Sequence, residues 1–414
     1  MYKRQIIMLA ILAAAVVYIG ASCECEQPAI QSITPASGAG GTIVKVVYAK
    51  GGIAGSVEYE GSLVPTRNAG NLGIGKTLFF TIPYDATAGA KQVAVKSAGK
   101  TSAPVSFTVT GSGTVPTPVI DGFEVPNATG TEITIFGSNF STLSKVFIDG
   151  TEVDHYYGAS EPFRQIPDDM VDNLIICTPA TDLVTGTSYN IQVKNPGDVN
   201  SAVFSATVPS RILRMEFDAI VGYDPPVYYV WRNNTVNTLR RTYTNCGWII
   251  DLVYDDLEIT DPQAGAAFSA NDLYSFWLAY ADRRISGASY MHGQFVSSFV
   301  DGYMGLMFMH TGRVPNLPSA HRREGFALFY DAFAANQRTA RYLRSTMHEA
   351  GHGFNLEHGD CSAGTTIMNQ TGSIGANWNY TFSNLSCTHL ESHNINAVRP
   401  GGDAFGARSC DTLH

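Results

Sequence analysis

The amino-acid sequence predicts a multidomain protein in which two all-β sandwiches are followed by an α+β domain. The chain has 414 residues, more than one hydrophobic core usually supports. Its first half contains short runs of alternating apolar residues broken by Gly, Pro and Asn, a pattern typical of small antiparallel sandwiches. Its second half alternates strand-like and helix-like segments, and one predicted helix carries two histidines four residues apart.

The β-rich half is an internal repeat. Pro28-Ala29-Ile30 opens the first unit and Pro118-Val119-Ile120 opens the second, and a Gly-Thr strand follows each opening. The second unit also contains Ile135-Phe136-Gly137-Ser138-Asn139-Phe140. Both units resemble IPT/TIG domains, which are immunoglobulin-like sandwiches of about 100 residues, and the first keeps less of the pattern. We expect a signal peptide at 1–22, a linker at 23–29, sandwiches at 30–110 and 118–208 joined by a linker at 111–117, and the α+β domain at 209–414.

The N-terminus predicts export. A basic start, Met1-Tyr2-Lys3-Arg4, precedes an apolar run from Ile6 to Ile19 and a region of small residues that ends at Cys23. Ala21-Ser22-Cys23 resembles the end of a lipobox, which implies membrane attachment through a lipid on Cys23. Simple secretion is the alternative, because Gly20 stands where an aliphatic residue is usual. We therefore expect a protein that is secreted or lipid-anchored at the bacterial cell surface or outer membrane.

The composition and net charge limit the kinds of partner that the protein can bind. The apolar content of 44% is that of a globular protein, and the formal net charge is −9. An acidic chain without a basic run is a poor partner for nucleic acid, so we expect none.

The main chemical signal is a run of residues from Thr346 to His358. His348 and His352 lie four residues apart, so on a helix their imidazoles share one face and can bind one metal ion. Glu349 projects beside that metal, where a carboxylate can act as a general base. Gly353 and Asn355 tolerate the left-handed backbone of a turn that returns His358 as a third ligand. Three imidazoles leave a fourth position for water, as in catalytic zinc sites.

The same run resembles the metzincin zinc peptidases, whose pattern is H-E-x-x-H-x-x-G-x-x-H followed by a turn that contains a methionine. The resemblance implies one catalytic Zn²⁺ on His348, His352 and His358, with Met368 as an apolar floor beneath them. Asn355 stands where the family usually has Gly, and Gln370 stands where some subfamilies carry a tyrosine. The subfamily is therefore left open.

The sequence also predicts the elements around this motif. One stripe of apolar residues has helical spacing and indicates a buried helix face: Leu273, Phe276, Trp277 and Tyr280. In the family, the edge strand before the zinc helix pairs with an extended peptide, and 303–310 is the candidate for it. The full set of expected elements is strands at 214–221, 248–254 and 303–310, and helices at 227–244, 339–353 and 383–396.

The remaining cysteines and histidines have less specific interpretations. Seven cysteines are present, and lipidation of Cys23 would leave six, with Cys361 and Cys387 as one conceivable disulfide. The alternative for Cys361 is a further metal ligand. Outside the motif, His310 and His321 could touch substrate or a second ion but are interpreted as solvated or hydrogen-bonded residues. His389 and His393 lie four apart on a predicted helix and are interpreted as surface residues.

These observations predict a zinc-dependent endopeptidase that hydrolyses extracellular or surface proteins by a zinc-activated water, with Glu349 as general base. The alternative is a surface-binding or adhesion protein that acts through its sandwiches, with an inactive or narrowly specific zinc domain. A cell-surface glycan or protein is the partner the sandwiches would then bind, although a spacer role is also open. Hydrolysis of a non-peptide amide fits the motif as well.

Overall fold

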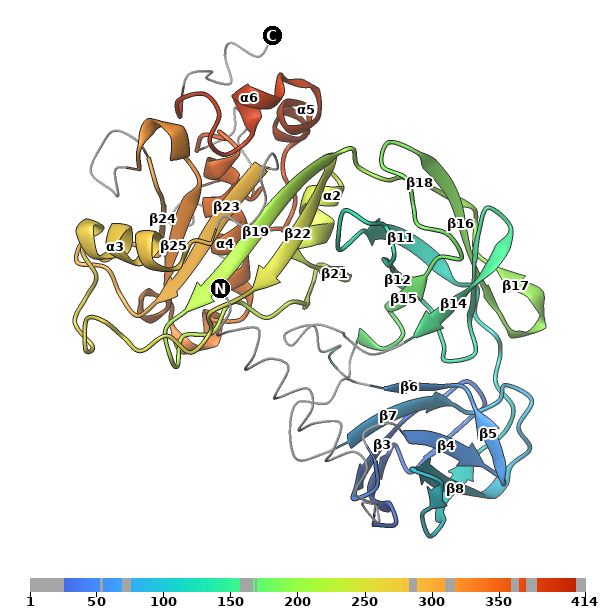
Figure 1. The fold of residues 1–414 in the computed structure, drawn as a ribbon. Coiled ribbons are helices and arrows are strands. Elements are labelled where there is room, and N and C mark those ends of the chain that lie inside the picture. The colour runs from blue at the N-terminus through green and yellow to red at the C-terminus, as the bar shows by residue number, and fades with distance from the viewer. Residues whose placement is uncertain are drawn as a thin grey trace, which may run out of the picture. The chain divides into compact units, whose positions relative to one another are not determined.

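The computed structural model describes residues 26–52, 55–68, 76–156, 167, 170–282, 289–309, 317–358, 365–369 and 378–406. The predicted signal peptide with Cys23, as well as Cys25, His310, Cys361, Gln370 and Cys410, lies outside these ranges. The chain divides into two compact units, one up to Thr114 and one from Val115 onward (Figure 1). Strands contribute far more of the described residues than helices do.

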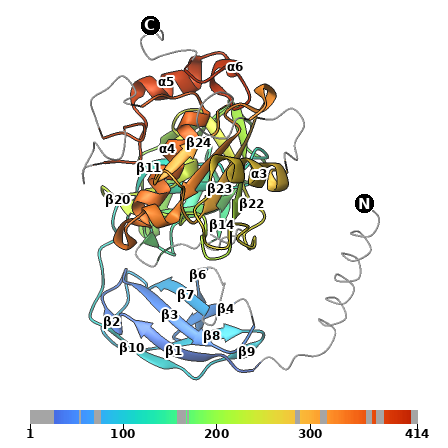
Figure 2. The same cartoon turned by 90° about the vertical axis from the view of Figure 1, so that its left-hand side faces the viewer.

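The first unit is a sandwich of two sheets, as predicted. Its core is built by alternation: along β3 every second residue, Val44, Val46 and Tyr48, is fully buried and faces Leu78 and Val93 from the other strands. Strands of both sheets are visible in Figure 2. One sheet has the order β1 (Ala29–Thr34), β3 (Ile43–Ala49), β7 (Lys76–Thr81), β6 (Thr66–Asn68). The other has the order β2 (Ser37–Gly38), β10 (Val105–Val109), β8 (Gly89–Ser97), β4 (Gly55–Tyr59), β5 (Ser62–Val64), with β9 (Lys100–Thr101) beside β8.

The second predicted sandwich opens the second unit. Its strands form one continuous hydrogen-bonded path, because β14 pairs with β13 along its first half and with β15 along its second half. The order is β11 (Val119–Glu124), β12 (Ile133–Ser138), β15 (Leu174–Thr178), β14 (Thr151–Tyr156), β13 (Lys145–Ile148), β16 (Ser188–Asn195), β17 (Val199–Asn200), with β18 (Phe204–Thr207) also on β16 and the short helix η2 (Pro196–Asp198) before β17.

The rest of the second unit is organised around a mixed five-stranded sheet. Its order is β22 (Trp248–Tyr254), β19 (Arg211–Ala219), β23 (Ser289–Val296), β25 (Gly325–Phe329), β24 (Gly305–Met307). The first four strands are parallel, and β24 is an antiparallel edge strand. Strands β23 and β25 are buried at every residue, because helices cover both faces, whereas β19 and β22 each keep three half-buried residues.

Two helices lie on opposite faces of this sheet (Figure 1). Phe295 of β23 packs against Tyr342 of α4 (Ala340–Gly353), with ring centroids 5.9 Å apart. The preceding residue, Gln294, donates through Nε2 to the carbonyl of Leu273 in α3 (Ala270–Tyr280) at 3.1 Å. Consecutive residues of a strand point to opposite faces, so α3 and α4 enclose the sheet between them.

Several sequence predictions are confirmed here. The strands expected at 214–221 and 248–254 are β19 and β22, and the zinc helix expected at 339–353 is α4. Helix α3 buries Leu273, Phe276 and Trp277 as expected, whereas Tyr280, expected in the same stripe, is half-buried. The strand expected at 303–310 is shorter, since β24 covers Gly305–Met307. Strands β23 and β25 were not expected from the sequence.

The helix expected at 227–244 is wrong over most of its length. Residues 230–237 form a hairpin of β20 (Val230–Arg232) and β21 (Thr235–Asn237), and only α2 (Leu239–Thr244) is helical. Asn233 and Asn234, between the two strands, have φ values of 54° and 58°. Asparagine tolerates this left-handed conformation, and two such residues in succession form a tight hairpin turn. A helix cannot continue through that turn.

The C-terminal predictions also need correction. The helix expected at 383–396 is interrupted at His393 and Asn394, which separate α5 (Asn384–Ser392) from α6 (Ile395–Val398). Cys387 is bonded to Cys246, 141 residues earlier, and not to Cys361. Short helices η3 (Ser319–His321), η4 (Tyr330–Ala332) and η5 (Ala335–Gln337) complete the elements. Among the described residues, every helix is too short or too polar to cross a membrane.

Candidate metal centre

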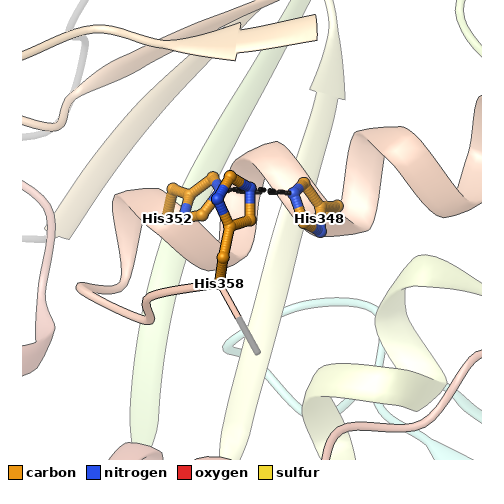
Figure 3. Close-up of side chains that lie close together, drawn as sticks. All are labelled: His348, His352 and His358. Atoms are coloured by element: carbon orange, nitrogen blue, oxygen red, sulfur yellow. Dashed lines mark hydrogen bonds between the residues drawn. The ribbon is translucent and has the colours of Figure 1, made fainter. Parts of the chain in front are cut away.

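Helix α4 and the turn after it bring the three predicted histidine ligands together (Figure 3). The Nε2 atom of His348 lies 3.2 Å from that of His352 and 3.0 Å from that of His358. The Nε2 atoms of His352 and His358 are 3.1 Å apart. His348 and His352 are buried, whereas His358 is exposed, so the centre is reached from the side of His358.

The turn that returns His358 depends on Asn355. Its φ is 67°, and the amide of Leu356 donates to the carbonyl of Gly351 at 3.1 Å, which closes the end of α4. The Asn355 side chain is held on both sides, since Nδ2 donates to Ala397 and Oδ1 accepts from the amide of Gly406. Asn355 therefore preserves the turn, although the metzincin pattern usually has glycine at this position.

Hydrogen bonds fix the tautomer of the two buried histidines. Nδ1 of His348 lies 2.7 Å from the carbonyl oxygen of Ile367, and Nδ1 of His352 lies 2.6 Å from that of Leu356. A carbonyl only accepts, so each Nδ1 carries the hydrogen and each Nε2 carries a lone pair. Two lone pairs that face each other repel, and a cation between them converts the contact into coordination.

The protonation states agree with this assignment. The pKa of His348 is lowered well below its usual value, mainly by burial and secondly by the neighbouring His352. The pKa of His352 is lowered to about 3, mainly by burial and secondly by His358. The pKa of His358 is also lowered, chiefly by burial. All three imidazoles are therefore neutral near pH 7, which is the form that binds a metal.

Glu349 follows His348 on α4, and its side chain lies against the edge strand β24. Its side chain is 8% exposed, and burial raises its pKa to about 8. A Cβ atom built on Gly305 of β24 would lie 2.7 Å from Cγ and 2.9 Å from Oε1 of Glu349. Only glycine at 305 leaves this space for the carboxylate, and sequence reasoning missed it because the contact is tertiary.

Met368 packs against α4 at Gly351, between His348 and His352. It is fully buried, and its sulfur would lie 2.5 Å from a Cβ on Gly351. Arg344 holds this segment in place, since its Nη2 lies 2.8 Å, 3.0 Å and 2.7 Å from the carbonyl oxygens of Thr366, Ile367 and Asn369. The sequence analysis did not single out Arg344, because an arginine on a helix is usually solvent-exposed.

A second buried arginine fixes the other end of α4. Arg323 donates through Nη1 to the carbonyls of Gly353 and Val398, and through Nη2 to Arg399. Burial lowers its pKa to about 10, so it remains charged at neutral pH. A cation at a helix C-terminus also interacts favourably with the helix dipole.

Another group of potential ligands lies on the opposite face of the sheet. Glu216, Asp218 and His292 are buried near one another under α3. All four carboxylate oxygens already accept hydrogen bonds, those of Glu216 from Asp282 and Tyr290, and those of Asp218 from the Asp256 amide and His292. The protein itself satisfies these acceptors, so the histidine trio is the stronger candidate metal centre.

The other histidines are placed differently from one another. His321 lies 3.0 Å from Oε2 of Glu324, as a hydrogen-bonded histidine would. His389 was expected at the surface, yet it is 1% exposed. Its ring lies 4.9 Å from that of His393, under the turn between α5 and α6, because α5 packs this side inward.

Comparisons with known proteins add little to this geometry. No family model and no curated protein matches the chain. Among solved structures, the extracellular region of plexin A4 matches at 18% identity and a TM-score of 0.20, covering 45% of this chain and 19% of that one. SGBP-B from a complex xyloglucan utilization locus in Bacteroides uniformis matches at 14% identity and a TM-score of 0.17, covering 43% and 47%. The adhesin InvE of Yersinia pseudotuberculosis matches at 16% identity and a TM-score of 0.16, covering 44% and 58%. The match spans less than two thirds of each of these three proteins, and the site is therefore argued from its own geometry.

Proposed function

We propose that the second unit is a zinc-dependent endopeptidase of the metzincin type. The observation that carries this proposal is the convergence of three imidazole Nε2 atoms, 3.0 to 3.2 Å apart, on a helix in which the buried Glu349 directly follows the first histidine. The motif resemblance described for 348–358 and Met368 supports the same assignment.

The residues present fit a zinc ion. His348, His352 and His358 would hold it through neutral imidazoles, which are preferred zinc donors. The carbonyls of Ile367 and Leu356 orient two of the rings, as outer partners do in known zinc sites. Zinc, when bound in such a site, acidifies a water molecule and polarises a substrate carbonyl.

Glu349 is the proposed general base and then general acid. It would take a proton from the attacking water and deliver it to the leaving amine. Burial raises its pKa to about 8 in the metal-free protein, and a bound cation would favour the ionised carboxylate that a general base requires. Its position against Gly305 places the carboxylate at the edge strand.

The edge strand supports a peptide as substrate. Strand β24 pairs with β25 on one side, and among the described residues it has no strand on its other side. An extended peptide can pair with such an edge through its main chain. Because Gly305 of β24 contacts Glu349, a peptide on this edge would pass the general base. Export, lipid attachment at Cys23 and a glycan or protein partner of the sandwiches remain predictions from the sequence.

The test compares the full chain with Glu349→Gln and, as a control, with the exposed Glu258→Gln. Zinc content and cleavage of unfolded proteins and a peptide library would be measured for each. We expect one zinc per chain in all three and cleavage by all but Glu349→Gln. A parent chain that binds zinc and cleaves nothing would favour the surface-binding alternative, and one that binds no zinc would refute the proposal.

A further inference from the structure

The second sandwich is joined to the metal-binding part of the chain by a buried polar network. Glu124, at the end of β11, is fully buried. Its Oε1 accepts a hydrogen bond from the hydroxyl of Tyr228 at 2.7 Å, and its Oε2 accepts one from Thr238, the N-cap of α2. Arg240, also buried, donates to the same Tyr228 hydroxyl at 2.9 Å. A buried carboxylate needs such partners, so this strand and α2 are fixed to each other.

Arg241 of α2 makes a second contact with the same strand. Its Nη2 lies 3.0 Å from Oδ1 and 3.1 Å from the carbonyl oxygen of Asp121, and its guanidinium covers the ring of Phe136 at 4.7 Å. A Cβ on Gly122 would lie 2.8 Å from Nη2 of Arg241. The absence of a side chain at 122 is therefore what lets Arg241 lie flat on β11.

The apolar core also extends from the second sandwich into the five-stranded sheet. The core cluster of the second sandwich, which includes Phe123 and Val208, also contains Ile249 of β22, and Ile212 of β19 packs against it. Both isoleucines belong to the five-stranded sheet. The sandwich and the sheet therefore share one hydrophobic core, in agreement with their grouping in a single compact unit.

Helix α2 carries this connection to the metal centre. The hydroxyl of Tyr243 donates to the carbonyl of Met347, the residue before His348, at 2.9 Å. Tyr243 is fully buried, and its ring packs against Phe354 at 4.9 Å, just beyond the end of α4. A hydrogen bond and a ring contact at two places along α4 restrict both its rotation and its sliding.

We propose that the second sandwich is a support for the metal centre, and that Tyr243 is the positioning residue through which α2 sets the place of His348. This inference rests on the proposed zinc site but not on proteolysis. The sandwich would then tune metal affinity, beyond adding to overall stability. The competing explanation is that the interface only stabilises the fold.

Two tyrosine variants, one on α2 and one on α4, test whether Tyr243 positions His348. Tyr243→Phe removes the hydroxyl that donates to Met347. Tyr342→Phe is the control, because this tyrosine lies on α4, is 1% exposed, and its hydroxyl has no hydrogen-bond partner among the described residues. The readouts are Zn²⁺ affinity by chelator competition and the visible spectrum of the Co²⁺-substituted full chain. We expect Tyr243→Phe to weaken Zn²⁺ binding by about tenfold and shift the cobalt bands, and Tyr342→Phe to leave both unchanged.

A second pair of variants tests whether the effect originates in the sandwich. Glu124→Gln alters the buried network, whereas Glu152→Gln changes an exposed carboxylate of the same sandwich that pairs with Lys145. We expect Glu124→Gln to weaken Zn²⁺ binding by about threefold with a cobalt shift in the same direction, and Glu152→Gln to match the parent. If Glu124→Gln fails to fold, Asp121→Asn, which is partly exposed, carries the comparison.

The outcomes separate the inference from the function it rests on. If Tyr243→Phe and Glu124→Gln lower the melting temperature but leave Zn²⁺ affinity and the cobalt spectrum unchanged, the positioning role is refuted while the zinc site stands. A parent chain that binds no zinc refutes the site and this inference together. Metal binding is measured without substrate, so a lack of proteolysis affects neither result.

Discussion

The carbonyl of Ile367 accepts hydrogen bonds from both Arg344, at 3.0 Å, and Nδ1 of His348, at 2.7 Å. One oxygen atom thus links the first candidate ligand to an arginine one turn earlier on the same helix. Arg344 is fully buried, and burial lowers its pKa to about 10, so it is charged at neutral pH. The orientation of the His348 ring therefore depends on how firmly Arg344 holds the segment around Met368.

Replacement of Arg344 by lysine is expected to weaken zinc binding by about tenfold, because the lysine side chain is one bond shorter and its ammonium would not reach the position of Nη2, the atom that binds all three carbonyls. Chelator competition on the full chain measures this change. Arg341→Lys, at a half-buried position on the same helix, is the control and should retain the parent affinity. Equal affinities in the two variants would show that Arg344 does not position the site.

Replacement of Gly305 by alanine is expected to lower kcat for peptide cleavage by at least about tenfold with unchanged zinc content. The added methyl group would lie within 3 Å of the Glu349 carboxylate and displace the proposed general base. Steady-state kinetics and metal analysis on the same sample separate the two effects. Loss of zinc along with activity would indicate a broader distortion and contradict this explanation.

Zinc binding is expected to release a proton from Glu349. In the metal-free protein its pKa is raised to about 8, so at pH 6.5 the carboxyl group is mostly protonated. A cation beside it favours the ionised form, and the group must then lose its proton. His348 and His352 add little, because burial lowers their pKa values far enough to leave them neutral at this pH, and His358 contributes equally in the parent and in Glu349→Gln.

Titration calorimetry at pH 6.5 in buffers of different ionisation enthalpy counts the released protons. The parent chain should release about one proton more than Glu349→Gln, and the difference should shrink as the pH rises past 8. Identical proton release by the two proteins would mean that Glu349 is already ionised before zinc binds.

Removal of the Cys246–Cys387 disulfide by Cys387→Ser is expected to lower the free energy of unfolding by about 2 to 4 kcal/mol. The bond closes a loop of 141 residues and ties the end of α2 to α5. Thermal unfolding with and without reductant provides the control: reductant should lower the melting temperature of the parent and leave that of the variant unchanged. A parent that is insensitive to reductant would exclude this role.

What the sequence predicted well lies within short stretches of chain. His348, Glu349, His352, Asn355 and His358 fall within eleven consecutive residues, so helical spacing and one turn determine their relative positions. The alternating strands of the two sandwiches are local patterns in the same sense. The position of Met368 also follows from a turn close to the motif in sequence.

What the sequence did not reveal depends on contacts between distant segments. Gly305 and Tyr243 meet the metal helix only after the sheet has formed, and neither belongs to a local pattern. The strand β23 was missed because it buries His292 and Gln294 along with its apolar residues, which hides the usual signal of a parallel strand. The partner of Cys387 was left open for the same reason, since spacing alone cannot choose among distant cysteines, and the structure pairs it with Cys246.

The presence of Ile249 in the core of the second sandwich bears on how such a protein can be rearranged during evolution. A module exchanged by recombination must bring a complete core with it. The first sandwich meets this condition, because its core cluster contains residues only from its own unit. The second sandwich does not, and a crossover at residue 209 would leave both halves with an incomplete interior. We therefore expect relatives of this chain to vary in the number of modules before Val115 and to inherit the sandwich after it together with the metal helix.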